Sequence, residues 1–133
     1  MMHQKAILFS DSEVATQILG TTSPKEQKAL GRQVRNFTQE VWAANRERIV
    51  EDGNYFKFKY GKDEGEGKDS GLRLRTKLLS TGHREIVEAS PMDRIWGVGF
   101  GAKNVEKRRK DWGLNLLGKA LERARERLRA EEE

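Results

Sequence analysis

The sequence predicts a mainly helical α+β domain with a few short strands. Two observations favour this fold class. Capping signals precede several segments whose apolar residues recur at helical spacing, and only two short segments are candidates for strands. No internal repeat is visible, so a repeat architecture is not expected. At 133 residues, the chain fits one domain, residues 1–133, with a small core.

Three short helices are expected in the first third of the chain. Residues 1–9 are helical in character from the start, so they predict the end of a helix whose beginning precedes the sequence given. An S-x-x-E capping box at Ser10 predicts a second helix, because each of its two side chains bonds an unpaired backbone amide. Another capping box at Ser23, with Pro24 at the first helical position, predicts a helix over about residues 24–30.

A long helix and a shorter one are expected in the middle of the chain. Thr38 is a candidate N-cap for an amphipathic helix that runs from Gln39 towards Phe58. Residues 61–71 (GKDEGEGKDSG) combine glycine with charge and contain no apolar side chain, which predicts a mobile surface loop. The next stretch, LRLRTKLLSTG, predicts a helix closed by Gly82 in the left-handed C-cap conformation.

The C-terminal half contains the strand candidates and the last helix. Residues 84–89 (REIVEA) are the best strand candidate, and residues 96–101 (WGVGFG) are a second one. In the last helix, apolar residues alternate at spacings of three and four, which predicts a stripe that lies on a core. This stripe consists of Leu114, Leu117, Leu121, Ala124 and Leu128.

The charge balance is basic. Lysine and arginine number 26 against 21 acidic residues, a formal net charge of +5. This balance favours polyanionic partners such as nucleotides or nucleic acid. Much of the excess lies in residues 103–110 (KNVEKRRK) and 119–129 (KALERARERLR). Runs of this kind are more often solvated helix faces than nucleic-acid patches, so we expect helix faces.

Composition excludes several classes of function. No cysteine is present, so a disulfide framework, a thiolate nucleophile and a cysteine-based zinc site are ruled out. The two histidines lie far apart in the sequence, so no metal site is expected. The apolar run at residues 6–9 is too short for a signal peptide, and no stretch could span a bilayer. We therefore expect an intracellular, cytoplasmic protein without a membrane partner.

The segment SPMDRIWG is the strongest candidate for a functional site. Ser90 and Pro91 predict a sharp turn that presents Asp93 from a loop. Asp93 could be a catalytic carboxylate, or it could accept hydrogen bonds from nearby amides and cap the turn. Trp96 could stack on a base or sugar, or pack in the core. Alternating glycines that start at Gly97 would admit a ligand or another backbone segment.

Two residues outside this segment also allow two interpretations. Asn115 could orient a phosphate or ribose near a helix N-terminus, or it could serve as an N-cap while Gly118 admits a closely packed element. Lys5 could be a solvated lysine. It could instead bind phosphate or, if its pKa is lowered, attack an anomeric carbon as an amine. His83 and Glu88 are titratable neighbours of the first strand candidate, and structural roles are favoured for both.

Five stretches carry a resemblance to a known family: MMHQKAILFSDSEVATQIL, PKEQKALGRQVRNF, GNYFKF, LLSTGHREIVEASPMDRIWGVGFG and WGLNLLGKALERARE. In order and spacing they resemble the YbiA-like (NADAR) family of N-glycosidases, and they cover nearly the whole chain. The resemblance implies an α+β fold that cleaves N-glycosidic bonds without a metal or redox cofactor. The implied substrates are early phosphorylated intermediates of riboflavin biosynthesis or ADP-ribosylated guanine bases.

The resemblance also implies site residues. Asp93 lies in the family's S-P-x-D-x-x-W-G motif, and Lys5 matches the lysine of its first active-site helix. Both are therefore implied to be catalytic. The residues implied to bind the substrate are Ser90, Trp96, Gly97, Asn115 and Arg32. Among them, Arg32 of the L-G-R motif is the candidate for holding phosphate.

Three hypotheses about function follow. The family's first motif begins with a glutamate three residues ahead of Met1, outside the sequence given. Cleavage through an oxocarbenium-like transition state calls for an acid that helps the base leave and a carboxylate that stabilises the cation or activates water. We therefore expect either an N-glycosidase or a catalytically impaired module that binds ADP-ribose or another nucleotide. A third hypothesis, ranked last because it rests on charge alone, is a basic protein that binds nucleic acid generally. The expected partner is a small-molecule nucleotide or ADP-ribosylated nucleic acid, and self-association is left open.

Overall fold

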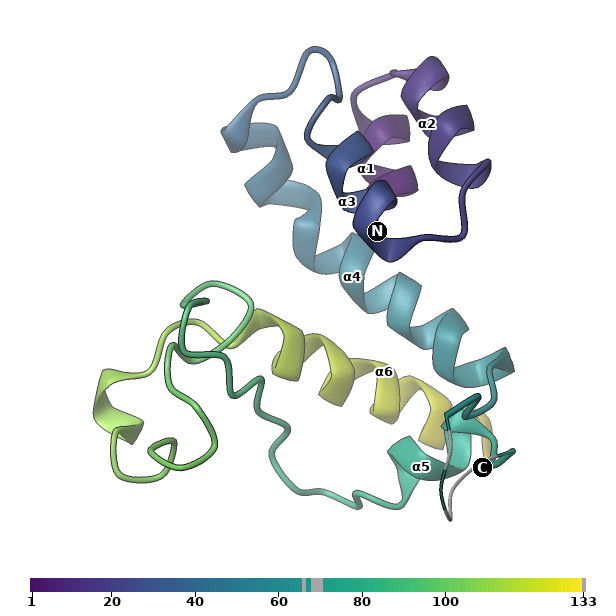
Figure 1. The fold of residues 1–133 in the computed structure, drawn as a ribbon. Helices are drawn as coiled ribbons and strands as arrows, with labels where there is room; N and C mark the ends of the chain where they lie inside the picture. The colour runs from purple at the N-terminus through teal and green to yellow at the C-terminus, as the bar shows by residue number, and fades with distance from the viewer. Residues whose placement is uncertain (66, 68–70, 133) are drawn as a thin grey trace. The chain divides into compact units, whose positions relative to one another are not determined.

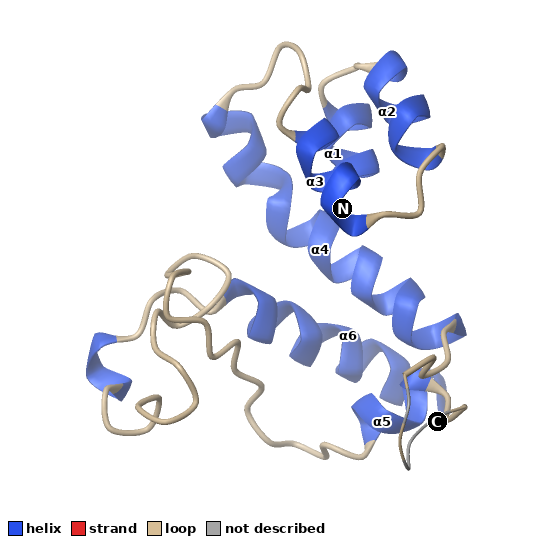
Figure 2. Ribbon diagram, in the orientation of Figure 1, coloured by secondary structure: helices blue, strands red, loops and turns tan. Residues whose placement is uncertain are grey.

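The computed structural model of the chain describes residues 1–65, 67 and 71–132. Among these residues it contains six α-helices and one short 3-10 helix, joined by loops (Figure 1). The same described residues form no strand (Figure 2). The mainly helical prediction is therefore confirmed, and the prediction of a few short strands is wrong for this part of the chain. The chain divides into two compact units, Met1–Ile49 and Val50–Glu133.

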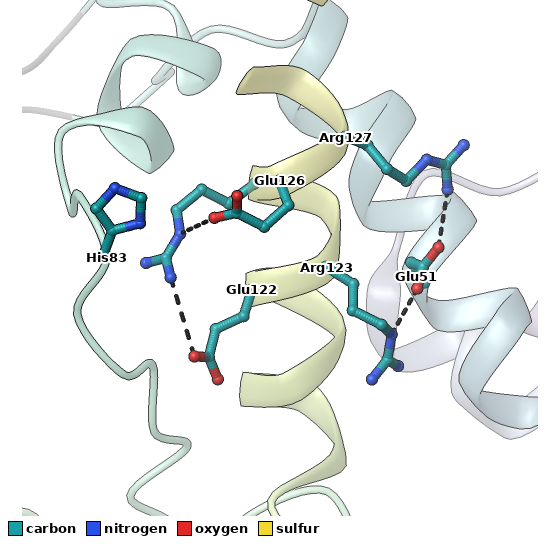
Figure 3. A pocket seen from close by; sticks show the side chains of 7 residues that line it. Glu51, His83, Glu122, Arg123, Glu126 and Arg127 are labelled. Atoms are coloured by element: carbon teal, nitrogen blue, oxygen red, sulfur yellow. Dashed lines mark hydrogen bonds and ion pairs between the residues drawn. The ribbon is translucent and has the colours of Figure 1, made fainter. Parts of the chain in front are cut away.

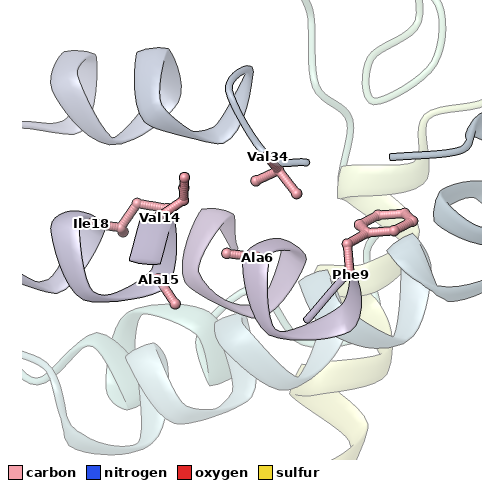
Figure 4. Close-up of a cluster of buried hydrophobic side chains, with 6 residues drawn as sticks. All are labelled: Ala6, Phe9, Val14, Ala15, Ile18 and Val34. Carbon is pink, nitrogen blue, oxygen red and sulfur yellow. The ribbon is translucent and has the colours of Figure 1, made fainter. Parts of the chain in front are cut away.

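Unit 1 consists of three short helices and the beginning of a long one. These are α1 (Met2–Leu8), α2 (Ser12–Leu19), α3 (Pro24–Gly31) and the first half of α4 (Gln39–Tyr60). α1 packs against both α2 and α3. Their shared apolar cluster consists of Ala6, Phe9, Val14, Ala15, Ile18 and Val34 (Figure 4). All four helices lie close to the positions that the sequence predicts.

The helix caps of unit 1 differ from the prediction in one place. Ser23 caps α3 by accepting a hydrogen bond from the Glu26 amide at 3.3 Å, as predicted. Ser10 does not cap α2, because it adopts a left-handed conformation with φ 58°. Asp11 takes its place and accepts from the Val14 amide at 3.2 Å. An aspartate is as good an N-cap as a serine, so the sequence alone could not separate the two.

Unit 2 contains the rest of α4, the helix α5 (Leu74–Leu79), the 3-10 helix η1 (Arg109–Asp111) and α6 (Leu116–Glu132). α5 packs on α6. Together with Tyr55 of α4 they form an apolar cluster, which consists of Tyr55, Leu78, Ala124 and Leu128. The predicted stripe of α6 is thus confirmed at Ala124 and Leu128, but Leu114 is 49% exposed. The reason is that α6 begins only at Leu116, so Leu114 precedes the helix.

Ion pairs join α4 to α6 within unit 2. The Arg123 guanidinium lies 2.5 Å from the Glu51 carboxylate, and Arg127 lies 2.8 Å from Asp52. Lys59 lies 3.3 Å from Glu131. The charged run at residues 119–129 is therefore a helix face, as predicted, and part of its charge is used within the unit.

The segment between α4 and α5 falls partly outside the described residues. The predicted mobile loop spans residues 61–71, of which residues 66 and 68–70 are not described. Its ends are hydrogen-bonded to each other, since the Asp63 amide donates to the Leu72 carbonyl at 2.7 Å. Beyond α5, Gly82 has φ 65°, so its predicted left-handed conformation is confirmed.

Candidate functional site

The predicted turn around Asp93 is present in unit 2. The Asp93 amide donates to the Ser90 carbonyl at 3.4 Å and closes the turn that Pro91 begins. The Asp93 Oδ1 atom then accepts hydrogen bonds from the amides of Ile95 at 2.9 Å and Trp96 at 2.8 Å. The capping interpretation of Asp93 is therefore confirmed. Its second oxygen, Oδ2, accepts no hydrogen bond from the residues that the structure describes, so it is available to a ligand.

The two strand candidates are replaced by a loop that Asn115 holds in place. The Asn115 Nδ2 atom donates to the Ile86 carbonyl, and its Oδ1 atom accepts from the Glu88 amide, both at 3.0 Å. The Glu88 carbonyl accepts from the Val98 amide at 3.0 Å. Side-chain bonds to the backbone compete with strand ladders, which explains why residues 84–89 and 96–101, all of them described, form no strand.

Glycines let these loop segments approach one another closely. A Cβ atom on Gly97 would lie 2.8 Å from the Glu88 carbonyl oxygen. On Gly118, at the start of α6, a Cβ atom would lie 2.0 Å from the Ile86 carbonyl oxygen. The alternative in which these glycines admit another backbone segment is therefore confirmed. Gly97, a predicted substrate-binding residue, is itself buried.

The start of α6 supports the Asp93 loop through its backbone. The amides of Asn115, Leu116 and Leu117 donate to the carbonyls of Gly97, Ile95 and Trp96 at 3.0 to 3.1 Å. These amides are consequently not available to an anion, although a helix N-terminus is often an anion site. Asn115 is buried, and its side chain positions the loop through residues 86 and 88.

Trp96, three residues after Asp93, has a side chain that is available to a ligand. Its backbone amide and carbonyl are both used, by Asp93 and Leu117 respectively. The indole is half-buried, and its N–H has no hydrogen-bond partner among the described residues. An indole in this state can offer both an apolar face and one donor to a ligand.

Unit 1 contains the other two predicted site residues, Lys5 and Arg32. Lys5 is half-buried on α1, and its Nζ atom donates to the Gly31 carbonyl at 2.8 Å. The same atom lies 4.7 Å from the centre of the Phe37 ring and 5.6 Å from that of Trp42. Burial, with a smaller contribution from the positive charge of Arg32, lowers the pKa of Lys5. Arg32 itself is exposed at the end of α3.

A pocket of about 550 Å³ lies elsewhere in unit 2, and none of the predicted site residues lines it. Its lining consists of Glu51, His83, Glu122, Arg123, Arg125, Glu126 and Arg127 (Figure 3). These charges mostly pair with one another, as Arg123 does with Glu51. Among the described residues, no group of three His, Asp or Glu side chains could hold a metal ion.

Arg94 lies inside the candidate motif, but it is not among the site residues predicted from the sequence. Its Nη2 atom donates to the Asp111 carbonyl at 2.6 Å, and its side chain lies against Gly99. Its own carbonyl accepts from the Leu114 amide at 2.8 Å. The position of Arg94 directly after Asp93 was the one available signal. Arg94 links the Asp93 loop to the segment that precedes α6.

These features define a mainly helical protein that presents a carboxylate and an indole on a loop supported by the start of its last helix. The chain belongs to the NADAR domain family, which matches residues 1–129. The resemblance seen in the sequence is thus confirmed.

Three relatives show how far the similarity extends. N-glycosidase R617 of Acanthamoeba polyphaga mimivirus is 41% identical over 128 residues, which cover 95% of this chain and 69% of that protein. Protein irg-1 of Caenorhabditis elegans is 33% identical over 96% of this chain and 57% of its own length. N-glycosidase Npun_R5314 of Nostoc punctiforme (strain ATCC 29133 / PCC 73102) is 30% identical over 95% of this chain and 69% of its own.

No helix among the described residues combines the length and the apolar character that crossing a bilayer requires.

Proposed function

We propose that this chain is an N-glycosidase that hydrolyses the N-glycosidic bond of a ribosylated or ADP-ribosylated base. Two relatives that the chain covers over two thirds of their length are named N-glycosidases. The observation that carries the proposal is the state of Asp93. One carboxylate oxygen fixes the turn while the other has no partner among the described residues. Asp93 is therefore a rigidly held carboxylate with one oxygen atom that can contact the substrate.

Each site residue has a role that suits this reaction. The Asp93 Oδ2 atom stabilises the positive charge that develops on the sugar, or activates the attacking water. Trp96 stacks on the base or sugar, and its free N–H can donate to the substrate. Ser90 and Gly97 shape the loop that carries these two side chains.

Lys5 and Arg32 supply the positive charge that a phosphorylated substrate requires. A lowered pKa makes the Lys5 amine a better general acid or base, and a better nucleophile, at neutral pH than an ordinary lysine. Arg32 is exposed, with no ion pair to the described residues, and can bind a phosphate group. Lys5 is the second catalytic residue of the proposal, and Arg32 is the phosphate-binding residue.

The proposed substrates are ADP-ribosylated guanine and an early phosphorylated intermediate of riboflavin biosynthesis. Both contain a ribose phosphate and a base joined through an N-glycosidic bond. Stacking of the base on Trp96, with the Asp93 carboxylate beside the sugar, would suit either substrate.

The test measures release of free ADP-ribose or ribose phosphate from the two substrates by chromatography, with Asp93→Ala beside the unaltered chain. We expect release from at least one substrate, reduced in Asp93→Ala by about 100-fold to 10,000-fold, the usual effect of losing a general acid or base. If neither substrate is cleaved while ADP-ribose still binds, the chain is a binding module and the enzymatic proposal fails.

A further inference from the structure

The basic run that ends in η1 is a folded loop, which corrects the prediction of a solvated helix face. We name residues 102–112 the basic loop. Residues 102–108 form turns and Arg109–Asp111 forms the 3-10 helix η1. The Trp112 indole donates to the Val105 carbonyl at 2.7 Å, and the Asn104 amide donates to the Gly101 carbonyl at 3.0 Å. The loop therefore has a defined conformation.

The arginines of the basic loop are used to hold it together. Arg109 forms two hydrogen bonds to the Glu85 carboxylate, at 2.7 and 3.0 Å, and its guanidinium lies 4.5 Å from the centre of the Trp112 ring. Arg108 lies 3.1 Å from the Asp111 carboxylate and 5.1 Å from the centre of the Phe100 ring. Their charges are partly neutralised and their positions are fixed.

The lysines of the basic loop, unlike its arginines, are not paired with any described residue. Lys103, Lys107 and Lys110 are all exposed, and none forms an ion pair or hydrogen bond with the part of the chain that the structure describes. Residues 94–112 contain six lysines and arginines and two acidic residues. This short stretch of the sequence therefore carries an excess of positive charge.

The basic loop is connected directly to the Asp93 loop. Arg94, the residue after Asp93, donates to the Asp111 carbonyl at 2.6 Å, and a Cβ atom on Gly113 would lie 2.2 Å from the Arg94 carbonyl oxygen. Ile95, on the same loop, is 45% exposed, and Met92 is 95% exposed. The basic loop is thus joined through Arg94 to a loop that exposes two apolar side chains.

We propose that the basic loop binds the phosphodiester backbone of nucleic acid through Lys103, Lys107 and Lys110. Lysines bind phosphates as mobile point charges without reading sequence, which matches three unpaired lysines on a fixed loop. The neighbouring aromatic rings, Phe100 and Trp112, already lie against guanidinium groups. Binding is therefore governed by charge and is indifferent to base sequence.

A membrane surface fits this loop less well than nucleic acid does. Segments that lie in a membrane interface are amphipathic helices with lysines on one face and large apolar residues on the other. Residues 102–108 are turns, and among them Val105 is the one large apolar residue and is half-buried.

The inference goes beyond the proposed function and does not depend on it. Binding of an unmodified oligonucleotide requires no cleavage, so it can succeed or fail separately from the glycosidase assay. If the chain both binds nucleic acid and is a glycosidase, it should bind substrates carried on nucleic acid more tightly than free nucleotides.

The test is fluorescence anisotropy with an unmodified 20-nucleotide single strand, its duplex, and vesicles that contain an anionic phospholipid, over 50 to 200 mM salt. The variant is Lys103→Ala/Lys107→Ala/Lys110→Ala. The matched control, Lys25→Ala/Lys28→Ala/Lys119→Ala, removes the same charge at three exposed lysines that have no partner among the described residues. Circular dichroism confirms that both variants are folded.

Three phosphate contacts predict a slope of log K against log salt of about −2.1 for the single strand and about −2.7 for the duplex, so affinity should fall roughly 20-fold and 40-fold respectively over this salt range. The basic-loop variant should lose most of this slope, and the control should retain it. Equal losses in both variants would overturn the proposal, because binding would then depend on net charge alone. Failure to bind either nucleic acid, with or without binding to the vesicles, would overturn it as well.

Discussion

Asp11 shows how one buried carboxylate can organise the connections of unit 1. It caps α2, accepts from the Arg35 amide at 2.9 Å, and pairs with the Arg35 guanidinium at 3.1 Å. The side-chain hydrogen bond from Arg35 is the main reason why the pKa of Asp11 falls to about 2, with a further contribution from the Arg35 backbone amide. The ionised form is therefore the one that the folded unit requires.

This low pKa predicts how stability depends on pH. A carboxylate whose pKa is lower in the folded state stabilises the protein above its unfolded pKa, and that contribution is lost as pH falls through the folded pKa. We expect Asp11→Asn to lower the melting temperature at pH 7, with a difference from the unaltered chain that shrinks between about pH 5 and pH 2. Thermal melts at several pH values measure this difference.

Glu13→Gln is the control for this prediction. Glu13 lies 3.5 Å from the same guanidinium but is exposed, so its loss should change the melting temperature little. A constant difference between Asp11→Asn and the unaltered chain from pH 7 to pH 2 would show that the charge of Asp11 does not contribute.

The sequence identified individual residues better than their partners. It singled out Asp93, Asn115 and the glycine positions, because residue type and spacing restrict what such side chains can do. It did not identify Arg35 as the partner of the Asp11 carboxylate, or Arg94 as the partner of the Asp111 carbonyl. These contacts join residues separated by loops of irregular conformation, and no periodic signal records them.

Among the elements, the start of α6 does the most to shape the candidate site. Its first amides bind the carbonyls of the Asp93 loop, and Gly118 lies directly under the Ile86 carbonyl. A helix that accepts a loop this closely needs a residue without a side chain at the contact. The geometry of the candidate site therefore depends on the packing of a helix that carries no proposed catalytic group.

Gly118→Ala tests this contact. Its Cβ atom would lie 2.0 Å from the Ile86 carbonyl oxygen and 2.5 Å from the Asn115 Nδ2 atom. Since backbone and buried amide must both move, we expect a loss of about 1–3 kcal/mol in the free energy of unfolding. Urea denaturation followed by circular dichroism measures the change.

Gly53→Ala on α4 is the matched comparison. Nothing lies within 4 Å of its Cβ position, so alanine should stabilise this helix by about 0.5–1 kcal/mol. If both substitutions shifted stability in the same direction by similar amounts, helix propensity and not the contact with Ile86 would explain the effect of Gly118.

The elements themselves were predictable where local chemistry decides them. Helices with caps or a proline at their start, such as α3, lie where the sequence places them. The strand candidates failed because residues 84–89 pair with the Asn115 side chain and with a neighbouring loop. Composition cannot distinguish an extended segment bound in this way from a strand, since the same β-branched residues suit both.

For the whole molecule, the two units carry different parts of the proposed machinery. Unit 1 carries Lys5 and Arg32, whereas unit 2 carries Asp93, Trp96 and the basic loop. The prediction of a single domain over residues 1–133 stays a prediction. The proposed activity is therefore best tested with the full chain.

We propose that the Asp93 carboxylate acts on substrate as well as fixing a turn. Asp93→Asn separates the two roles, because the amide oxygen can still accept from Ile95 and Trp96 while the negative charge is lost. The most direct measurement is the rate at which Asp93→Asn and the unaltered chain release ADP-ribose or ribose phosphate, alongside their melting temperatures. We predict similar melting temperatures and a rate lowered by about 100-fold to 10,000-fold. An unchanged rate would contradict the claim and leave Asp93 with the turn alone.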